Sequence, residues 1–361
     1  MATIKNLNAH DRPPEKVRAT YKKYQHVRLS EIEQDPDVID LEKLDQDDLP
    51  DPFIILESLS SEGLREAFDE FMGKGHLSHK THGTALIEGV PVIAHKRVSG
   101  LRMIPSLIPP TIQSKLLSLM LHRDLSDPSH QTNLHLHYDI QYPNVSNHGS
   151  GTDDTKDTPQ SYASFFEADP SLALTAKDPN IHKAITVQNM LDKKLRWVTL
   201  GGQYNWTTKV YPDGPPPAFP ADIARLLGAA FPETDAQAAI VNFYSANDTL
   251  SMHRDVSEKC DVGLISVSIG CDGLFMISHD DGEGCEVIRL RSGDAVYMSG
   301  RSRFAWHGVP KIIPETCPTW LRDWPGPEYP FWQGWMSGKR INLNVRQMTD
   351  AKPNQDAALA L

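Results

Sequence analysis

Four His-x-Asp motifs occur in the chain, and each has a spacing that can place two metal ligands side by side. In an extended segment, residues i and i+2 point to the same side, so an imidazole and a carboxylate can reach one ion. The motifs begin at His122, His137, His253 and His279. A metal that activates oxygen needs one such pair and a second histidine from a distant strand, which leaves coordination positions open.

The motif at His253 fits this requirement because it opens the β-rich half of the chain. It follows the strand-like run 239–244 after a short polar turn. A further histidine, His307, lies beyond several more strand-like runs. Such a path can return the chain to the mouth of the same barrel. We therefore predict that His253, Asp255 and His307 are the metal ligands.

The other three motifs favour structural roles. His122 ends an amphipathic helix and suits a C-terminal cap, His137 lies in a polar region, and His279 begins an acidic turn with a glycine. The tripeptide His-Arg-Asp also occurs in the catalytic loop of kinases. That class requires an asparagine where this chain has Cys260, and no glycine-rich phosphate loop precedes it, so the kinase interpretation is rejected.

Two arginines near the C-terminus could hold a small dicarboxylate. The run 340–346 (Arg-Ile-Asn-Leu-Asn-Val-Arg) alternates polar and apolar residues, so both arginines share one face of a strand. Two buried guanidiniums are costly unless an anion meets them, and arginine pairs with a carboxylate through two parallel hydrogen bonds. The alternative is an edge strand with one solvated face.

These motifs, in this order, resemble the AlkB-like dioxygenases, which use Fe(II), 2-oxoglutarate and O2. The family pattern is His-x-Asp, a distal histidine, and then Arg-x-Asn-x-x-x-Arg. The strand Asn242-Phe243-Tyr244 is similar to the family's Asn-x-Tyr before the iron motif, and the run 265–270 is similar to its Val-Ser-Val-Ser-Leu-Gly strand. The runs 293–296 and 299–303 are similar to the segment that leads to the distal histidine. Residues 195–206 resemble the eukaryotic branch typified by the first human AlkB homologue. The convincing resemblance covers about 195–348.

The resemblance implies an Fe(II) site, a 2-oxoglutarate site and a reaction. Iron would be bound by the three predicted ligands, and Arg340 is expected to pair with the distal carboxylate of 2-oxoglutarate. The implied 2-oxoglutarate residues are Asn242, Tyr244, Arg340, Asn342 and Arg346. The implied reaction hydroxylates an N-linked methyl group, which is then lost as formaldehyde, while the protein supplies geometry and excludes water.

The implied substrate is a methylated nucleobase, in RNA (transfer RNA in particular) or in DNA. A base must be single-stranded or flipped out for oxidation, and it is then held by stacking. Tyr204, Trp206 and Tyr211 are candidates for stacking, with packing in the core as the alternative. Ser257 stands where the bacterial DNA-repair members carry an acidic residue that contacts the base, a departure that fits the eukaryotic, RNA-modifying branch. Candidates for phosphate contacts are Lys193, Lys194, Arg196 and Lys209.

Two other functions remain open alongside demethylation of nucleic acid. Some AlkB relatives act on peptide side chains, so the substrate could be a histone or another protein. Others act as lyases at abasic sites, with a lysine that forms a Schiff base. Turnover of methylated transfer RNA compared with methylated histone or another methylated protein would distinguish a nucleic-acid demethylase from a protein demethylase. Loss of activity on chelation of the metal would exclude the lyase.

The fold class indicated by these patterns is α+β, with a double-stranded β-helix (jelly-roll) core, N-terminal helices and a substrate-lid region. We expect a charged, partly disordered N-terminal extension, a helical and lid region that supports substrate binding, the Fe(II)/2-oxoglutarate core, and a tail. These are residues 1–55, 56–215, 216–350 and 351–361. Helices are predicted at 14–28, 60–74, 110–121 and 221–231, from apolar spacing and capping residues.

Composition restricts the partners and the compartment. The chain has 361 residues and a net charge of −11, which argues against nonspecific coating of nucleic acid but allows a local basic groove. Its run 31–51 is strongly acidic, and the first interpretation of this run is a solvated tail. No run reaches the ~18 apolar residues of a membrane span, and neither a secretory signal nor a zinc-type cysteine spacing is visible. We expect an intracellular monomer in the nucleus and cytoplasm, with a mitochondrial location as the alternative.

Overall fold

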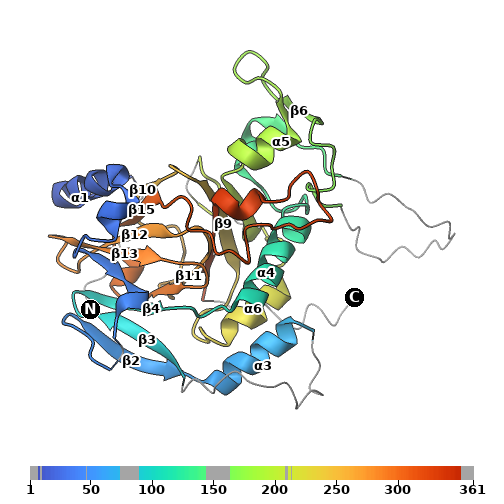
Figure 1. Cartoon of the computed structure of the whole chain (residues 1–361). Coiled ribbons are helices and arrows are strands. Elements are labelled where there is room, and N and C mark those ends of the chain that lie inside the picture. The colour runs from blue at the N-terminus through green and yellow to red at the C-terminus, as the bar shows by residue number, and fades with distance from the viewer. Residues whose placement is uncertain are drawn as a thin grey trace.

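Two large β-sheets, a small three-stranded sheet and a set of outer helices form the α+β fold (Figure 1). The larger sheet has eight strands in the order β2-β3-β4-β14-β11-β16-β9-β8, and the smaller has five in the order β1-β13-β12-β15-β10. The computed structural model describes residues 7–8, 10–45, 47–73, 89–143, 163–207, 210–212 and 214–350. The expected tail 351–361 and Lys209 lie outside these residues.

In the eight-stranded sheet, the central strand β16 has one apolar face and one polar face. The strands are β2 (Phe53–Leu59), β3 (Val90–His95), β4 (Val98–Ile104), β8 (Trp197–Gly201), β9 (Ala238–Ser245), β11 (Leu264–Gly270), β14 (Ala295–Met298) and β16 (Lys339–Arg346). Alternate residues Ile341, Leu343 and Val345 are fully buried in the main hydrophobic core, together with residues of α4 (Pro110–Ser118) and α6 (Ala221–Gly228). The residues between them therefore face the other way, as strand periodicity requires.

The five-stranded sheet is covered on both faces, and strand β12 shows the alternation. Its strands are β1 (Val38–Asp40), β10 (Leu250–His253), β12 (Gly273–Ser278), β13 (Cys285–Leu290) and β15 (His307–Ile312). Phe275 and Ile277 belong to a core shared with β11 and β14 of the larger sheet. Leu274 and Met276 instead belong to a separate core with α1 (Glu15–His26), which Figure 1 shows against this sheet.

The helices agree with the sequence-based predictions, with shorter ends. Helix α3 (Ser61–Phe71) begins after Ser60, whose side chain accepts a hydrogen bond from the Gly63 amide and so caps the helix as predicted. After Ser118, helix α4 continues as a wider turn through Leu119–Asp124. The remaining short helices are α2 (Leu29–Ile32), α5 (Val187–Asn189) and one-turn segments at Leu41–Lys43, Asn133–Leu136, Met190–Lys194, Ser302–Phe304 and Trp335–Gly338.

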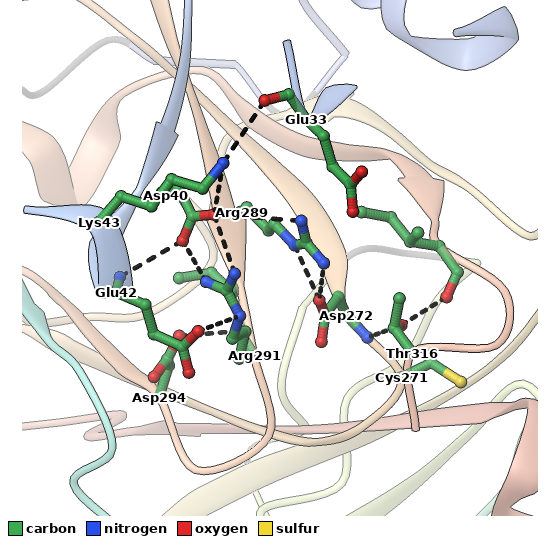
Figure 2. Close-up of polar contacts among 12 residues, drawn as sticks. Glu33, Asp40, Glu42, Lys43, Cys271, Asp272, Arg289, Arg291, Asp294 and Thr316 are labelled. Carbon is green, nitrogen blue, oxygen red and sulfur yellow. Dashed lines mark hydrogen bonds and ion pairs between the residues drawn. The ribbon is translucent and has the colours of Figure 1, made fainter. Parts of the chain in front are cut away.

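The acidic N-terminal run joins the folded core instead of forming a solvated tail. Strand β1 pairs in parallel with β13 and completes the edge of the five-stranded sheet. Asp40, at the end of β1, forms a two-point ion pair with Arg291, and Arg289 beside it pairs with Asp272 at 2.8 Å (Figure 2). Asp40 therefore has largely buried arginines as partners, which charge counting along the sequence does not show.

A small lobe stands at one end of the molecule, where β6 and α5 are labelled in Figure 1. It contains the short sheet β5 (Tyr138–Asp139), β6 (Ala173–Ala176) and β7 (Ile185–Thr186). Elsewhere, Phe166 packs against the indole rings of Trp324, Trp332 and Trp335, with ring centroids 5.2 to 5.5 Å apart. Among the helices of the described residues, none is long and apolar enough to span a bilayer.

Candidate active site

The three predicted metal ligands converge at neighbouring strands of the smaller sheet. His253 ends β10 and lies directly opposite His307, the first residue of the antiparallel strand β15, with 4.3 Å between the ring centroids. The Nε2 atoms of His253 and His307 are each 3.8 Å from an oxygen of the Asp255 carboxylate. One ligand atom from each residue lies within 4.8 Å of the other two. The convergence predicted from the motif is therefore confirmed.

Backbone carbonyls orient both imidazoles. Nδ1 of His253 lies 2.9 Å from the Ser251 carbonyl oxygen, and Nδ1 of His307 lies 3.1 Å from the Ala305 carbonyl oxygen. A carbonyl can only accept a hydrogen bond, so Nδ1 carries the proton in each ring and Nε2 keeps its lone pair. Metal-binding histidines are commonly held this way, and both lone pairs here face Asp255.

The electrostatics of the triad favour a divalent cation. Burial alone would raise the pKa of Asp255, but Arg346 and the two histidines hold it well below its usual range. Burial, followed by the neighbouring His253, lowers the pKa of His307 to about 4. At neutral pH, Asp255 is therefore ionised and His307 is neutral, which are the protonation states that ligate a metal.

A second carboxylate lies behind the triad and links two arginines. Arg346 donates from Nη2 to Asp255 Oδ2 at 3.2 Å and from Nη1 to Glu258 Oε1 at 3.1 Å. Glu258 Oε2 accepts from Arg303 Nη2 at 2.7 Å, and Arg303 Nη1 donates to the Asp255 carbonyl at 2.8 Å. Sequence analysis did not find the role of Glu258, because its partner Arg303 is distant in the chain and no local spacing links the two.

Arg340 is buried without a charged hydrogen-bond partner among the described residues. Its guanidinium donates to Ser268 Oγ at 2.7 Å and, with longer bonds of 3.4 and 3.3 Å, to the carbonyls of Cys271 and Leu290. Its Nε has no partner within the described part of the chain, and the same holds for the buried hydroxyl of Tyr244, its direct neighbour on β9. Burial lowers the pKa of Arg340 and raises the pKa of Tyr244. A carboxylate placed between them would satisfy both orphaned donors.

The remaining predicted cosubstrate residues lie on the same polar face. Asn342 is directly opposite Asn242 in the β9–β16 register. The Asn342 amide donates to Ser266 Oγ at 2.9 Å and to the Val267 carbonyl at 3.0 Å, and its Oδ1 accepts from Asn344 at 2.8 Å. Asn342 therefore ties β16 to β11 between the two arginines.

The predicted stacking residues form one aromatic cluster next to the triad. Tyr204 packs edge-on against both Trp206 and Tyr211, with ring centroids 4.9 and 5.3 Å apart. Its hydroxyl lies 3.3 Å from Ser257 Oγ, two residues after Asp255. Trp206 also contacts Trp197 at 5.0 Å and remains 38% exposed. The structure thus brings together all four predicted substrate-binding residues.

A cavity of about 700 Å³ opens beside this cluster. Tyr211 and Ser257 are among the residues that line it, together with Phe219, Met348 and the prolines at 212 and 215–217. Such a volume accommodates a flat aromatic group between apolar walls. Of the predicted phosphate contacts, Lys193 and Lys194 are exposed, whereas Arg196 forms an ion pair with Asp248.

The other His-x-Asp motifs lie away from the triad. His122 is not a helix cap, because its ring stacks on Tyr329 at 4.8 Å and its Nδ1 lies 2.7 Å from Ser164 Oγ. His279 does begin the predicted turn between β12 and β13, and its Nε2 lies 2.6 Å from Glu286. His137 packs against His182 in the lobe, with 4.3 Å between ring centroids.

Two imidazoles and one carboxylate at one point, near a buried Arg340 that has no anionic hydrogen-bond partner among the described residues, define the site of a non-haem Fe(II) oxygenase with an acidic cosubstrate. Residues 171–346 match the family model described as the 2OG-Fe(II) oxygenase superfamily. The chain is 43% identical over 362 residues to the N6-methyladenosine RNA demethylase ALKB1 of Pyricularia oryzae, covering 96% of this chain and 99% of that protein. It belongs to the AlkB-type branch of the 2OG-Fe(II) oxygenases.

Two further relatives agree with this assignment. The N6-methyladenosine RNA demethylase ALKBH of Cryphonectria parasitica is 50% identical over 232 residues, which cover 60% of this chain and 100% of that protein. The tRNA demethylase abh1 of Schizosaccharomyces pombe is 37% identical over 278 residues, which cover 74% of this chain and 85% of that protein. The cofactors of the enzyme are Fe(II) and 2-oxoglutarate, and the donor set and the orphaned buried donors fit both.

Proposed function

We propose that the protein is an oxidative demethylase of methylated adenine in RNA, including transfer RNA. The observation that carries this proposal is the triad of His253, Asp255 and His307 in one structure with a buried Arg340 that has no described anionic partner. The substrate class is supported by three relatives with long alignments, which are named as RNA or tRNA demethylases.

In this function, Fe(II) with 2-oxoglutarate supplies the oxidation of an N-linked methyl group. One O2 is consumed, 2-oxoglutarate becomes succinate and CO2, and the methyl group leaves as formaldehyde. His253, Asp255 and His307 would hold the metal, and the oxidising chemistry is what Fe(II) and 2-oxoglutarate would supply there. The protein's own contribution is to orient both substrates and to exclude water.

Arg340 and Tyr244 bind the distal carboxylate of 2-oxoglutarate in this proposal. The two residues are direct partners in the β9–β16 register, and their buried Nε and hydroxyl donors have no hydrogen-bond partner among the described residues. Arg346 lies at the metal end of the same strand, six positions further on, and contacts Asp255. Asn242 and Asn342 lie between the two ends, where they line the path of the cosubstrate. In this proposal, the eight-stranded and five-stranded sheets on either side of this path correspond to the double-stranded β-helix expected from the sequence.

The aromatic cluster binds the base. Tyr204, Trp206 and Tyr211 offer ring faces and edges beside the triad, and stacking on such rings holds a base in any sequence context. The Ser257 hydroxyl is paired with Tyr204 and replaces the acidic residue of the DNA-repair members. The lobe that carries exposed Lys193 and Lys194 forms the lid that meets the phosphates.

The test is a panel of substrates assayed for succinate and formaldehyde in the presence of Fe(II) and 2-oxoglutarate. We expect turnover of RNA and transfer RNA that carry methylated adenine, in excess of that on methylated single-stranded DNA. Turnover confined to methylated peptides would replace this proposal with a protein demethylase. Cleavage at abasic sites that survives chelation would replace it with a lyase.

A further inference from the structure

We infer that Glu258 is a positioning residue for the iron site, which holds Arg346 so that Asp255 keeps its lone pairs for the metal. The inference rests on the proposed function, because it assumes that Asp255 binds a metal ion. Glu258 does not face the ligand position itself. It acts through Arg346 and Arg303, and its side chain is only 1% exposed.

The contacts form a closed ring that returns to Asp255. Arg346 donates from Nη2 to the Asp255 carboxylate at 3.2 Å and from Nη1 to Glu258 Oε1 at 3.1 Å. The other Glu258 oxygen, Oε2, accepts from Arg303 Nη2 at 2.7 Å. Arg303 Nη1 closes the ring by donating to the Asp255 carbonyl at 2.8 Å. Arg303 is anchored by a further bond from Nε to the Val262 carbonyl at 3.0 Å. Both the side chain and the backbone of the ligand are therefore held by one bridging carboxylate.

The Glu258 carboxylate determines how many hydrogen bonds Arg346 forms with Asp255. A guanidinium prefers a two-point pair with a carboxylate, with two parallel hydrogen bonds. Arg346 makes only one bond to Asp255, because its other terminal nitrogen is held by Glu258. Without Glu258, the guanidinium is free to pair with both Asp255 oxygens. It would then compete with the metal for the same lone pairs.

Charge balance acts in the same direction. The ring contains two buried carboxylates and two buried guanidiniums, with side chains between 1% and 16% exposed. Neutralising Glu258 leaves an excess positive charge next to the position of a divalent cation, in a region where charges are weakly screened. Both the geometry and the charge therefore predict weaker metal binding.

The test measures Mn(II) binding by titration calorimetry, so that no turnover is needed. We expect Glu258→Gln to weaken Mn(II) binding about 10- to 100-fold, the usual effect of losing a group that orients a metal ligand. The double variant Glu258→Gln with Arg346→Gln should recover to within about threefold of the wild type, because the competing guanidinium and the excess charge are both gone. A purely structural role of Glu258 would give no such recovery.

The matched control is Glu286→Gln, which removes another partly buried carboxylate that pairs with His279 away from the triad. It should bind Mn(II) as the wild type does. If Glu258→Gln does not fold, Glu258→Asp keeps the charge but is too short to span both arginines, and at least threefold weaker binding is expected. Wild-type affinity in either folded Glu258 variant, or a double variant as weak as the single one, would overturn the inference. Failure of the wild type itself to bind Mn(II) and 2-oxoglutarate would instead refute the proposed function.

Discussion

His253 and His307 face each other as direct cross-strand partners on β10 and β15, and this pairing sets the position of the metal site. Side chains on a strand alternate between faces, so a register slip of one residue would turn one of the imidazoles to the opposite face. The β10–β15 pair contains a register irregularity between Leu250 and His253, immediately before the ligand. The local geometry of these two strands is therefore part of the catalytic machinery.

Replacing His253 with alanine should abolish succinate formation, because two ligands no longer hold the metal in the facial arrangement. Mn(II) binding measured by calorimetry should fall with it. The matched control is His137→Ala, which breaks a second His-x-Asp motif in the lobe and should leave both measurements unchanged. Full turnover by His253→Ala would contradict the assignment of this ligand.

Replacing Arg340 with methionine should raise the KM for 2-oxoglutarate by roughly 30-fold or more, since truncating a buried charged partner of an anion costs at least about 2 kcal/mol. Thermal unfolding should be affected little, because the guanidinium makes only one short described hydrogen bond, to Ser268. The control Arg289→Met removes a buried arginine that pairs with Asp272, and it should lower stability without changing the KM. An unchanged KM for Arg340→Met would remove this residue from the cosubstrate site.

Replacing Trp206 with alanine should raise the KM for methylated RNA by about 5- to 150-fold, the effect of losing 1 to 3 kcal/mol of stacking. Turnover of 2-oxoglutarate in the absence of RNA should stay the same, because Trp206 lies outside the ring of contacts around Asp255. Trp320→Ala changes a similarly exposed tryptophan (42% exposed) and serves as the control. Equal effects of the two substitutions would indicate loss of surface packing instead of base recognition.

Acid should destabilise the tryptophan-rich region through His122. Burial lowers the pKa of His122 to about 4 from the ordinary value of 6.5, with a small opposing effect of Glu328. Between these pH values, the unfolded state binds more protons at this residue than the folded state. The free energy of unfolding therefore falls as pH decreases from 6.5 to 4, and the contribution of this residue is fully present above 6.5.

Urea unfolding of the metal-free protein across this pH interval measures the effect. His122→Phe keeps a ring against Tyr329 but cannot be protonated, so its stability should depend on pH less steeply, by up to about one proton. His307 titrates in the same interval and remains in the variant. Parallel pH profiles for the wild type and His122→Phe would show that this ring does not titrate as described.

The central strands could be predicted from the sequence, but the two strands that carry the histidine ligands could not. Strand β16 is predictable because Ile341, Leu343 and Val345 alternate with polar residues. Strand β10 has only four residues, and β15 contains Pro310, which cannot donate a ladder hydrogen bond and therefore lowers any strand prediction. The ligands were found by chemistry and spacing, while their strands depend on tertiary pairing.

The role of Glu258 and the docking of the N-terminal run could not be predicted from the sequence, for a different reason. Each depends on an arginine far away in the sequence, Arg303 for Glu258 and Arg291 for Asp40. Periodicity describes which face of an element is buried, and it carries no information on which distant charges meet there. Ion pairs of this kind become visible only when the fold is assembled.

The pairing of β1 with β13 also has a consequence for the making of the protein. Asp40 and its partner Arg291 are 251 positions apart. At about 5–20 residues per second, a ribosome needs roughly 12 to 50 s to reach Arg291 after Asp40 has been added. During this interval, Ile39 and Leu41 lack the apolar surface that later covers them. Strand β1 therefore docks on β13 only after most of the sheet that receives it has been synthesised.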